Sequence, residues 1–455
     1  MPIQEKEPGR LIIKAVCFLV PMSLAIQIDV GSKIFVAELL IPCIALILLT
    51  IKRDRYFDRE FRFILFVGSA YLVAQVMADL WNESSYDQYS RGWSRILFFL
   101  INFFSIYILI DNKKTHLLLF CLGFSLGRVF LTFTGMEGDV IPWKIGLAKP
   151  VALLVILCFV FGSVLRLAKT YVCIIALLAL GLFDILMDFR SHGSILITTA
   201  VILLGSTLVR RNLNRRKGWE IRSTLALLIG GGIAAFGAFQ FYSHAARSGW
   251  LSERAINKFE AQVEQANTSV IVAGRSEVLV YFEAIFDSIL LGHGSWPRNA
   301  YYAEKLADER YDRGLSASQV RSTNDAIPIH SHVFGSWIEA GVVGGLFWIN
   351  ILILAVRSLV RSSASSSQMR PLYLYGAILL TWDVFFSPFS SFRRIETAFL
   401  IVIVLKSLRQ MRIQGMRRVK SSRYRMRSGG RRRRRRRSND AGRIERDRKP
   451  VHALS

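Results

Sequence analysis

Apolar runs long enough to cross a lipid bilayer recur along the whole 455-residue chain. A helix needs about 20 predominantly apolar residues to span the hydrocarbon core. Hydrophobic residues make up 52% of the chain, which is more than an ordinary soluble protein of this length contains. The sequence therefore predicts an all-α, polytopic integral membrane protein.

Twelve candidate spans are predicted, at residues 11–28, 34–51, 63–81, 95–110, 117–135, 150–165, 170–189, 194–209, 223–242, 331–356, 372–388 and 395–408. The first run has no small-residue cleavage site after it, and another span follows at once, so it is interpreted as a helix rather than a signal peptide. The predicted organisation is nine spans in 1–242, a long loop in 243–329, three spans in 330–409 and a tail in 410–455.

Lys and Arg are concentrated in alternate loops, for example in residues 52–59, 210–217 and 357–370. Cytoplasmic loops of membrane proteins carry such an excess, so these loops are expected on the inside. An even number of spans then puts both termini in the cytoplasm. The loop 243–329 lies outside in this orientation, and loops of this length are usually functional. It contains two helix-like stretches, Glu253 to Ala266 and Ser276 to Leu291.

The C-terminal segment 406–455 holds 20 Lys or Arg against three acids, a net charge of +17 out of +26 for the whole chain. This composition predicts a disordered tail that binds anionic lipids of the cytoplasmic leaflet. Nucleic acid is not expected as a partner, because the tail lacks interleaved aromatic residues and a folded module. The five cysteines all lie in apolar runs and are interpreted as small core residues rather than disulfides or metal ligands.

One stretch, Pro328 to Val356, places polar side chains at the mouth of a membrane helix. With 3.6 residues per turn, one helix face is predicted to carry His330, Phe334, Trp337, Gly341 and Gly345. Two of these, Gly341 and Gly345, are expected to let a neighbouring helix approach closely. The free N–H groups at the start of the helix favour an anion nearby.

The same stretch carries a family signature. His330-Ser331, nine further residues and Gly341-Val-Val-Gly344 resemble the pattern of the O-antigen ligase and polymerase superfamily, which is His, then Asn, Ser or Gln, nine residues, then Gly-x-x-Gly. Upstream, Ala273-Gly274-Arg275 followed by Leu291-Gly292-His293-Gly294-Ser295 is similar to the outer-loop Gly-Arg … Gly-x-Gly pattern of that family. The predicted topology, with one long outer loop before the tenth span, also agrees.

The resemblance implies a membrane glycosyltransferase of the GT-C type in the bacterial inner membrane. Such an enzyme moves a glycan from undecaprenyl diphosphate to an acceptor sugar at the outer (periplasmic) face, with inversion and without a metal or cofactor. The acceptor is lipid A-core in a ligase of lipopolysaccharide biosynthesis, or another lipid-linked repeat in a polymerase of O-antigen or exopolysaccharide. The sequence leaves the choice between ligase and polymerase open.

The resemblance also implies roles for individual residues. His330 is expected to orient or deprotonate the acceptor hydroxyl, which a histidine can do near neutral pH. Arg275 and Arg190 are expected to hold the diphosphate, since the guanidinium fork suits phosphate oxygens. The match at Arg190 is weaker, because Phe189 stands where the family tends to have a serine. Further candidates for supporting roles are His332, Glu339, Arg128 and His293.

Each candidate also has a structural interpretation. The histidines at 330 and 332 could hydrate a helix mouth, and His293 could serve a turn. Arg275 could pair with acids in the loop, and Arg190 could pair with Asp188 or reach the interface. Glu339 could orient a histidine or be a buried structural acid, while Arg128 could reach a phosphate or pair with Asp184 or Asp188.

Two functions of other classes stay open. Spans with intramembrane charges also suit a transporter or flippase of a lipid-linked substrate. Against this interpretation, the chain shows no repeated half and no paired spans broken by Gly or Pro. A non-catalytic assembly protein that recruits partners through the basic tail is the other alternative, and deleting residues 410–455 separates it from an enzyme.

Overall fold

The computed structural model describes residues 7–29, 33–51, 57–111, 113–135, 142–164, 170–212, 219–251, 253–260, 277–312, 325–327, 329–365, 367–391 and 393–414. Residues 1–406 form one compact unit and residues 407–455 a second. In the second unit, residues 407–414 are helical. The predictions for Arg275 and for most of the basic tail fall outside the described residues.

A helix occupies each predicted span, and the all-α class is confirmed. The helices are α1 (Glu7–Met22), α2 (Val36–Ile51), α3 (Arg59–Trp81), α4 (Tyr86–Ile110), α5 (Lys114–Gly135), α6 (Ala148–Val164), α7 (Thr170–Leu186), α8 (Arg190–Asn212), α9 (Trp219–Arg247), α15 (His332–Ser363), α16 (Arg370–Phe386) and residues 394–406. A π-helical turn, η2 (Trp143–Leu147), precedes α6.

Several of these helices have the length and composition of membrane spans. Among the described residues, six helices are long and apolar enough to cross a membrane: Arg59–Trp81, Tyr86–Ile110, Lys114–Thr134, Trp143–Gly162, Arg190–Leu208 and His332–Ser363. The helices α2 and α7 are shorter and also apolar. The chain thus has the character of a membrane protein, while the count of twelve spans and their orientation stay predictions.

One β-hairpin interrupts the helical pattern. After α1 and a 3-10 turn, η1 (Ser23–Ala25), strand β1 (Gln27–Asp29) pairs antiparallel with β2 (Lys33–Phe35). The predicted first span, which extended to Ile28, is therefore too long. The sequence did not predict this hairpin, because the isoleucines of its strands continue the apolar runs on either side.

A buried ion pair fixes the start of α2. The carboxylate of Glu38 accepts from Nε and Nη2 of Arg394, each at 2.6 Å, and from the amide of Asn102 at 2.9 Å. Both charged side chains are at most 1% exposed. A buried charge is costly unless it is paired, so this contact links the start of α2 to α4 and to the last helix of the unit.

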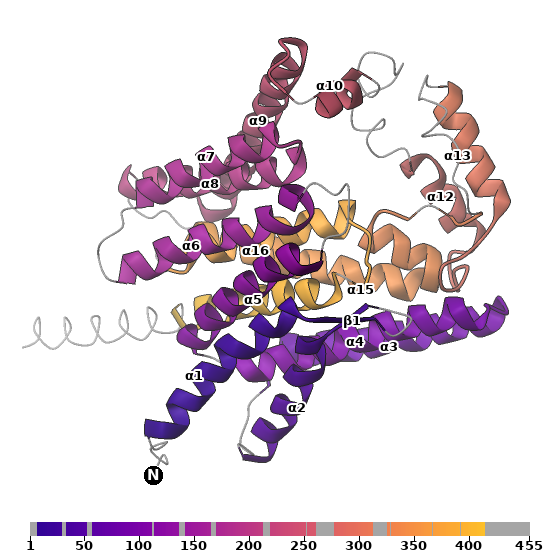
Figure 1. Ribbon diagram of the computed structural model, residues 1–455, viewed down its shortest axis with the longest axis horizontal. Helices are drawn as coiled ribbons and strands as arrows, with labels where there is room; N and C mark the ends of the chain where they lie inside the picture. Colours follow the sequence, from indigo (N-terminus) through magenta and orange to yellow (C-terminus); the bar gives the residue numbers. More distant parts are fainter. Residues whose placement is uncertain are drawn as a thin grey trace, which may run out of the picture. The chain divides into compact units, whose positions relative to one another are not determined.

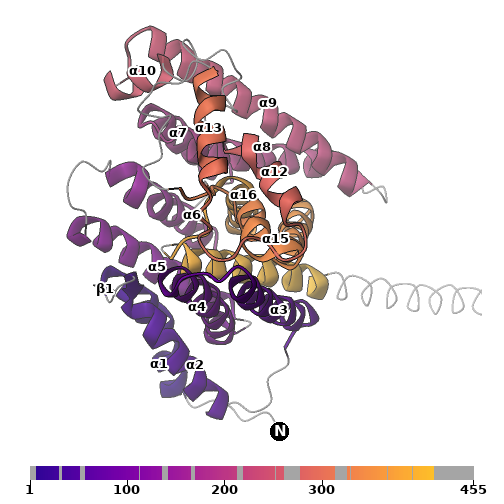
Figure 2. The same ribbon diagram turned by 90° about the vertical axis from the view of Figure 1, so that its right-hand side faces the viewer.

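The helices α15 and α16 lie at the centre of the first unit. Figures 1 and 2 both show them between the pair α3 and α4 on one side and the helices α6 to α8 on the other. Contacts of α15 with α3 and α16, and of α16 with α6 and α8, agree with these views. Side chains from the first turns of α15 and the last turns of α16 can therefore meet groups from both sides.

The predicted outer loop contains three helices among its described residues. They are α10 (Glu253–Phe259), α12 (Val278–Asp287) and α13 (Ala300–Asp312). The helix α12 ends at Asp287, before the predicted Leu291, whereas residues 261–266 of the other predicted stretch lie outside the described part of the chain. The helix α13 was not predicted because its sequence is polar. The buried side chains Tyr281, Ala284 and Ile285 of α12 pack with Ile338 of α15. The helix α12 is thereby fixed beside the start of α15 (Figure 2).

An ion pair joins α12 to α13 at their surface. Lys305 and the Tyr301 hydroxyl both donate to the carboxylate of Glu283. These hydrogen bonds lower the pKa of Glu283, and the same contact raises the pKa of Lys305. Exposed ion pairs contribute little to the free energy of unfolding, so the main effect of this pair is on the orientation of α13.

Candidate functional site

The helix α15 is interrupted at two consecutive small residues, Ala340 and Gly341. It begins after Ser331, whose hydroxyl accepts from the backbone N–H of Phe334 at 3.3 Å. Helical geometry fails at Ala340 (φ −126°, ψ 19°) and Gly341 (φ 62°, ψ −156°). A positive φ of this kind is available to glycine at no steric cost. The break leaves carbonyl groups of the preceding turn without their helical partners.

The family-like segment Leu291–Ser295, here named the docked loop, uses these carbonyls. His293 N donates to Ile338 O at 2.7 Å, and Gly294 N donates to Glu339 O at 3.0 Å. A Cβ at Gly341 would lie 2.0 Å from the carbonyl oxygen of Leu290. The predicted close approach of a neighbouring helix at Gly341 is wrong, because the nearest neighbour is this loop. The two family-like motifs are thus in direct backbone contact.

The side chain of His293 serves the turn. Its Nε2 donates to the carbonyl of Ala284 at 2.7 Å. The glycines on either side, Gly292 and Gly294, have φ of 80° and 82°. This arrangement corresponds to the structural interpretation of His293.

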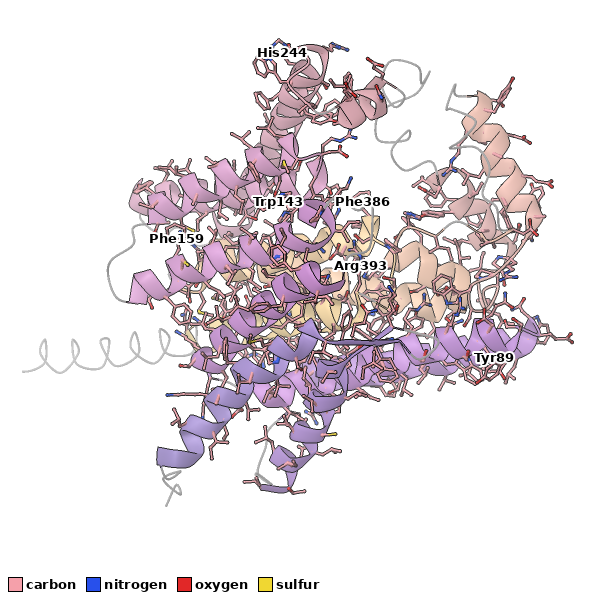
Figure 3. The ribbon with its side chains drawn as sticks, in the orientation of Figure 1. Tyr89, Trp143, Phe159, His244, Phe386 and Arg393 are labelled. Carbon is pink, nitrogen blue, oxygen red and sulfur yellow. The ribbon has the colours of Figure 1, made fainter. Side chains whose placement is uncertain are left out.

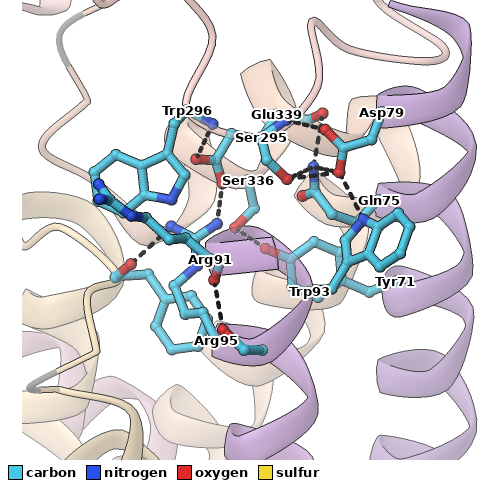
Figure 4. Close-up of polar contacts among 12 residues, drawn as sticks. Tyr71, Gln75, Asp79, Arg91, Trp93, Arg95, Ser295, Trp296, Ser336 and Glu339 are labelled. Carbon is cyan, nitrogen blue, oxygen red and sulfur yellow. Dashed lines mark hydrogen bonds and ion pairs between the residues drawn. The ribbon is translucent and has the colours of Figure 1, made fainter. Parts of the chain in front are cut away.

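Asp79 of α3 holds the docked loop from the other side (Figure 4). Its carboxylate accepts from the backbone N–H of Ser295 at 2.5 Å, from the Ser295 hydroxyl at 2.6 Å and from Trp93 Nε1 at 2.7 Å. The side chain of Gln75 donates to the Ser295 hydroxyl at 3.0 Å. Charge-assisted bonds of this kind are about twice as strong as neutral ones, so Asp79 is a main anchor of the loop.

Glu339, a predicted supporting residue, forms a buried ion pair with Arg95 of α4 (Figure 4). The two side chains are 4% and 7% exposed. Arg95 also donates to the carbonyl of Phe389 at 3.0 Å and lies over the ring of Trp296. Of its two interpretations, Glu339 therefore fits that of a buried structural acid. Arg95 was not predicted from the sequence, and it connects Trp296, directly after the docked loop, to the segment after α16.

The two histidines at the start of α15 have different surroundings. The side chain of His330 is 48% exposed, and its Nδ1 lies 4.0 Å from Glu277. His332 is buried, and its Nδ1 donates to the carbonyl of Ser387 at 2.6 Å. The hydroxyl of Ser387 in turn donates to Asp383 at 2.6 Å. His330 is thus accessible from outside the helix bundle, whereas His332 connects to a cluster of charges at the end of α16.

That cluster centres on Asp383. Its carboxylate lies 2.8 Å from Arg393 Nη1 and 3.6 Å from Lys149 Nζ. Lys149 also lies 2.6 Å from Glu396. Figure 3 labels Arg393, a member of this cluster. The start of α6, the end of α16 and the start of the following helix are therefore joined by alternating charges.

A pocket of about 550 Å³, its open mouth included, lies beside this cluster. We name it the cationic pocket after its basic residues Arg128, Lys144 and Lys149. Its other polar lining is Tyr375 and Glu396, and its apolar wall includes Phe124, Leu153, Leu379, Phe399, Leu400 and Ile403. The pocket thus combines fixed positive charge with a hydrocarbon-like wall.

Arg128 is the unusual member of this lining. Its residue is partly buried, and within the described part of the chain its guanidinium makes no hydrogen bond or ion pair. It does not pair with Asp184 or Asp188, as one of its two interpretations required. It does interact electrostatically with Glu396, a carboxylate that Lys149 also contacts. Two cations that share one carboxylate in a desolvated site favour the binding of a further anion.

Arg190, the predicted diphosphate ligand, begins α8 and has protein partners. Its Nε lies 3.6 Å from Asp188, and its guanidinium lies 4.5 Å from the ring centre of Tyr242. Asp188 also lies 3.3 Å from Lys144. The structure thus brings Arg190 to the cationic pocket through Asp188, whereas His330 lies beside Glu277 on the side of α12.

Several members of the site were not predicted: Arg95, Lys144, Lys149, Tyr375, Arg393 and Glu396. A sequence signal existed for the basic ones. Lys144, Lys149 and Arg393 fall in or near loops predicted to be outside, where Lys and Arg are expected to be scarce. Cations that depart from this bias are candidates for binding anions.

Comparison of the chain with models of known families, with curated proteins and with solved structures finds no match. Within the described residues, no three His, Cys, Asp or Glu side chains are arranged to hold a metal ion.

Proposed function

We propose that the protein is a membrane glycosyltransferase that moves a glycan from undecaprenyl diphosphate to an acceptor sugar at the outer face of the bacterial inner membrane. The observation that carries this proposal is the cationic pocket. A polyprenyl diphosphate needs fixed cations for its phosphates and an apolar surface for its chain, and the pocket offers both. Arg128 in particular shares the carboxylate of Glu396 with Lys149, so its guanidinium can bind a phosphate oxygen.

The arrangement of the two family-like motifs supports the same function. Each motif alone is short, but their glycines Gly292 and Gly341 contact each other through the backbone, so the two motifs form one structural unit. This contact fixes the first turns of α15, which begin directly after His330 and contain His332. In the proposed reaction His330 orients or deprotonates the acceptor hydroxyl, which attacks the anomeric carbon with inversion while the diphosphate leaves.

Most groups of the site come from helix ends that the predicted orientation places outside, whereas Tyr375 lies nearer the start of α16. These are the ends of α3, α5, α7 and α16 and the starts of α4, α6, α8 and α15. A site at this level could take a donor from the outer leaflet and an acceptor from the periplasm. Both termini are then cytoplasmic, and the basic tail is available to anionic lipids of the inner leaflet.

The cell-surface glycan profile of a deletion strain of the native host tests the proposal. Complementation uses wild type, Arg128→Gln, Arg190→Ala, Arg275→Ala and His330→Ala. Finished polymer that is not attached to lipid A-core indicates a ligase, and single repeat units in place of long chains indicate a polymerase. Loss of a secreted polysaccharide with unchanged lipopolysaccharide indicates an exopolysaccharide polymerase. An unchanged profile in the deletion contradicts the proposal, and full activity of a normally accumulated His330→Ala protein contradicts the role of His330.

The break in α15 favours a transporter of lipid-linked substrates as a second candidate, since transporter sites use interrupted helices. In those sites the freed backbone groups line a cavity. Here the freed carbonyls of Ile338 and Glu339 accept from the docked loop, so they are occupied within the protein. This difference leaves the glycosyltransferase as the better supported function.

A further inference from the structure

We propose that Tyr375 donates a hydrogen bond to the diphosphate in the cationic pocket, and that His192 and Asp184 behind it take up one proton when the diphosphate binds. This inference rests on the proposed function for the identity of its ligand. It adds a buried relay of three side chains to the cations that line the pocket.

The three side chains form a continuous chain of hydrogen bonds. The Nδ1 of His192 lies 2.7 Å from Asp184, and its Nε2 lies 3.0 Å from the Tyr375 hydroxyl. Asp184 is 0% exposed and His192 is 1% exposed. The second oxygen of Asp184 accepts from Trp143 Nε1 at 2.8 Å. In the proposed relay Nδ1 donates to Asp184, and Nε2 is the nitrogen that gains the proton.

The protonation of Nε2 decides whether the Tyr375 hydroxyl can donate a hydrogen bond into the pocket. When Nε2 carries no proton, the Tyr375 hydroxyl donates to it, and only oxygen lone pairs face the pocket. When Nε2 is protonated, it donates to the Tyr375 oxygen, and the hydroxyl proton is free to point into the pocket. A diphosphate needs donors, so it binds to the second arrangement. The proton comes from water, and no covalent bond forms or breaks in this step.

The charges that face Tyr375 come from the elements packed around α16. Arg128 and Lys149 line the same pocket from α5 and α6, and Glu396 lines it from the following helix. Asp383 lies on α16 itself, where it faces Lys149 and Arg393. The second histidine of the site, His332, is separate, since its Nδ1 donates to Ser387. Replacing His192 alone therefore tests the relay without changing His332.

Binding measurements on the full-length protein in lipid nanodiscs test the relay. The probes are undecaprenyl diphosphate and inorganic pyrophosphate, each titrated from about pH 6 to about pH 8. For wild type, the dissociation constant is expected to rise with pH by up to about tenfold per unit, as linkage to one proton requires. His192→Gln is expected to lose this slope. Tyr375→Phe is expected to bind at least about tenfold more weakly, because it removes a hydrogen bond to a charged group.

Tyr373→Phe is the matched control, because Tyr373 is buried on the same helix but does not line the pocket. It is expected to keep the wild-type affinity and slope. Thermal unfolding of each variant shows whether it is folded, and Tyr375→Phe still tests the relay if His192→Gln does not fold.

The two probes separate the relay from the proposed function. The probes themselves ionise near neutral pH, so the comparison is between variants. A slope in His192→Gln equal to that of wild type, or an affinity that Tyr375→Phe does not change, overturns the relay, while donor binding by wild type leaves the proposed function standing. Binding of pyrophosphate with a slope that depends on His192, but no binding of undecaprenyl diphosphate, supports the relay and contradicts the lipid donor. Failure of wild type to bind either probe overturns both.

Discussion

Gly292 in the docked loop and Gly341 in α15 are packed backbone against backbone. A Cβ at Gly292 would lie 2.5 Å from the amide nitrogen of Gly341, closer than any side chain can be. Both residues also have a positive φ, of 80° and 62°. The contact therefore requires glycine at both positions for steric and for conformational reasons.

Gly341→Ala is expected to lower the free energy of unfolding by at least about 2 kcal/mol, because it adds strain at a positive φ and a clash with Leu290. Thermal unfolding of purified protein in detergent measures the loss. Gly232→Ala is the control, since an added Cβ there has no atom within 4 Å. Equal stability of the two variants would show that the break in α15 is not needed for the fold.

The buried pair of Arg95 and Glu339 predicts strong coupling. Replacing either residue alone by methionine leaves an uncompensated buried charge and is expected to cost about 3–5 kcal/mol. Replacing both is expected to recover most of that loss, because the double variant buries no charge. Unfolding curves of the two single variants and the double variant measure the coupling. A double variant as unstable as the sum of the singles would refute it.

Asp79 is expected to control the order of the docked loop. Asp79→Asn keeps the shape of the side chain but removes the charge that accepts from Ser295 and Trp93, at a cost of about 1–3 kcal/mol. Hydrogen exchange of residues 291–296 is therefore expected to become faster. The control is Asp87→Asn, which removes an exposed carboxylate that pairs with Arg91 along its own helix. Faster exchange in the control as well would mean that general charge, not this contact, holds the loop.

Arg128 and Lys149 line one pocket but are expected to respond differently to mutation. Lys149→Met breaks contacts with Asp383 and Glu396 and is expected to destabilise the protein by several kcal/mol, about the cost of one unpaired buried charge. Arg128→Gln removes a cation that has no such contact among the described residues, so the melting temperature is expected to stay or rise while donor binding weakens at least about tenfold. Loss of stability in Arg128→Gln without loss of binding would make Arg128 structural.

The basic tail is expected to be dispensable for chemistry. A protein that ends at residue 414 is predicted to keep its transfer rate, because no residue of the proposed site lies beyond that point. Its binding to vesicles that contain anionic lipid is expected to weaken. Loss of transfer in purified, folded protein would favour the assembly function in which the tail recruits partners.

The sequence was sufficient to predict where the helices lie, because a membrane span leaves a long apolar run. It could not predict the hairpin at residues 27–35, whose side chains continue the apolar pattern. It also could not distinguish two uses of Gly341, since a glycine in an apolar run is equally compatible with a close helix contact and with a broken turn. The helix α13 was missed because it has no apolar run.

The candidate site was predicted only in part for a related reason. His330, His332 and Arg190 belong to short local patterns, so they could be named from the sequence. The cationic pocket takes Arg128 and Lys144 from consecutive elements and Tyr375 from a distant helix, and only the fold brings them together. No local spacing of residues predicts such a site, although basic residues in loops predicted to be outside indicate candidates for it.

The most direct test of the proposed glycosyltransferase is a reconstituted transfer reaction. Purified protein in proteoliposomes receives an undecaprenyl-diphosphate-linked glycan and an acceptor, either lipid A-core or a second lipid-linked repeat, and the new glycosidic product is measured with the released undecaprenyl diphosphate. Wild type is predicted to form both products, and Arg128→Gln to form them at least about tenfold more slowly, as expected for losing a charge-assisted phosphate contact. Movement of the lipid-linked glycan across the bilayer without any product would contradict the glycosyltransferase and establish a transporter.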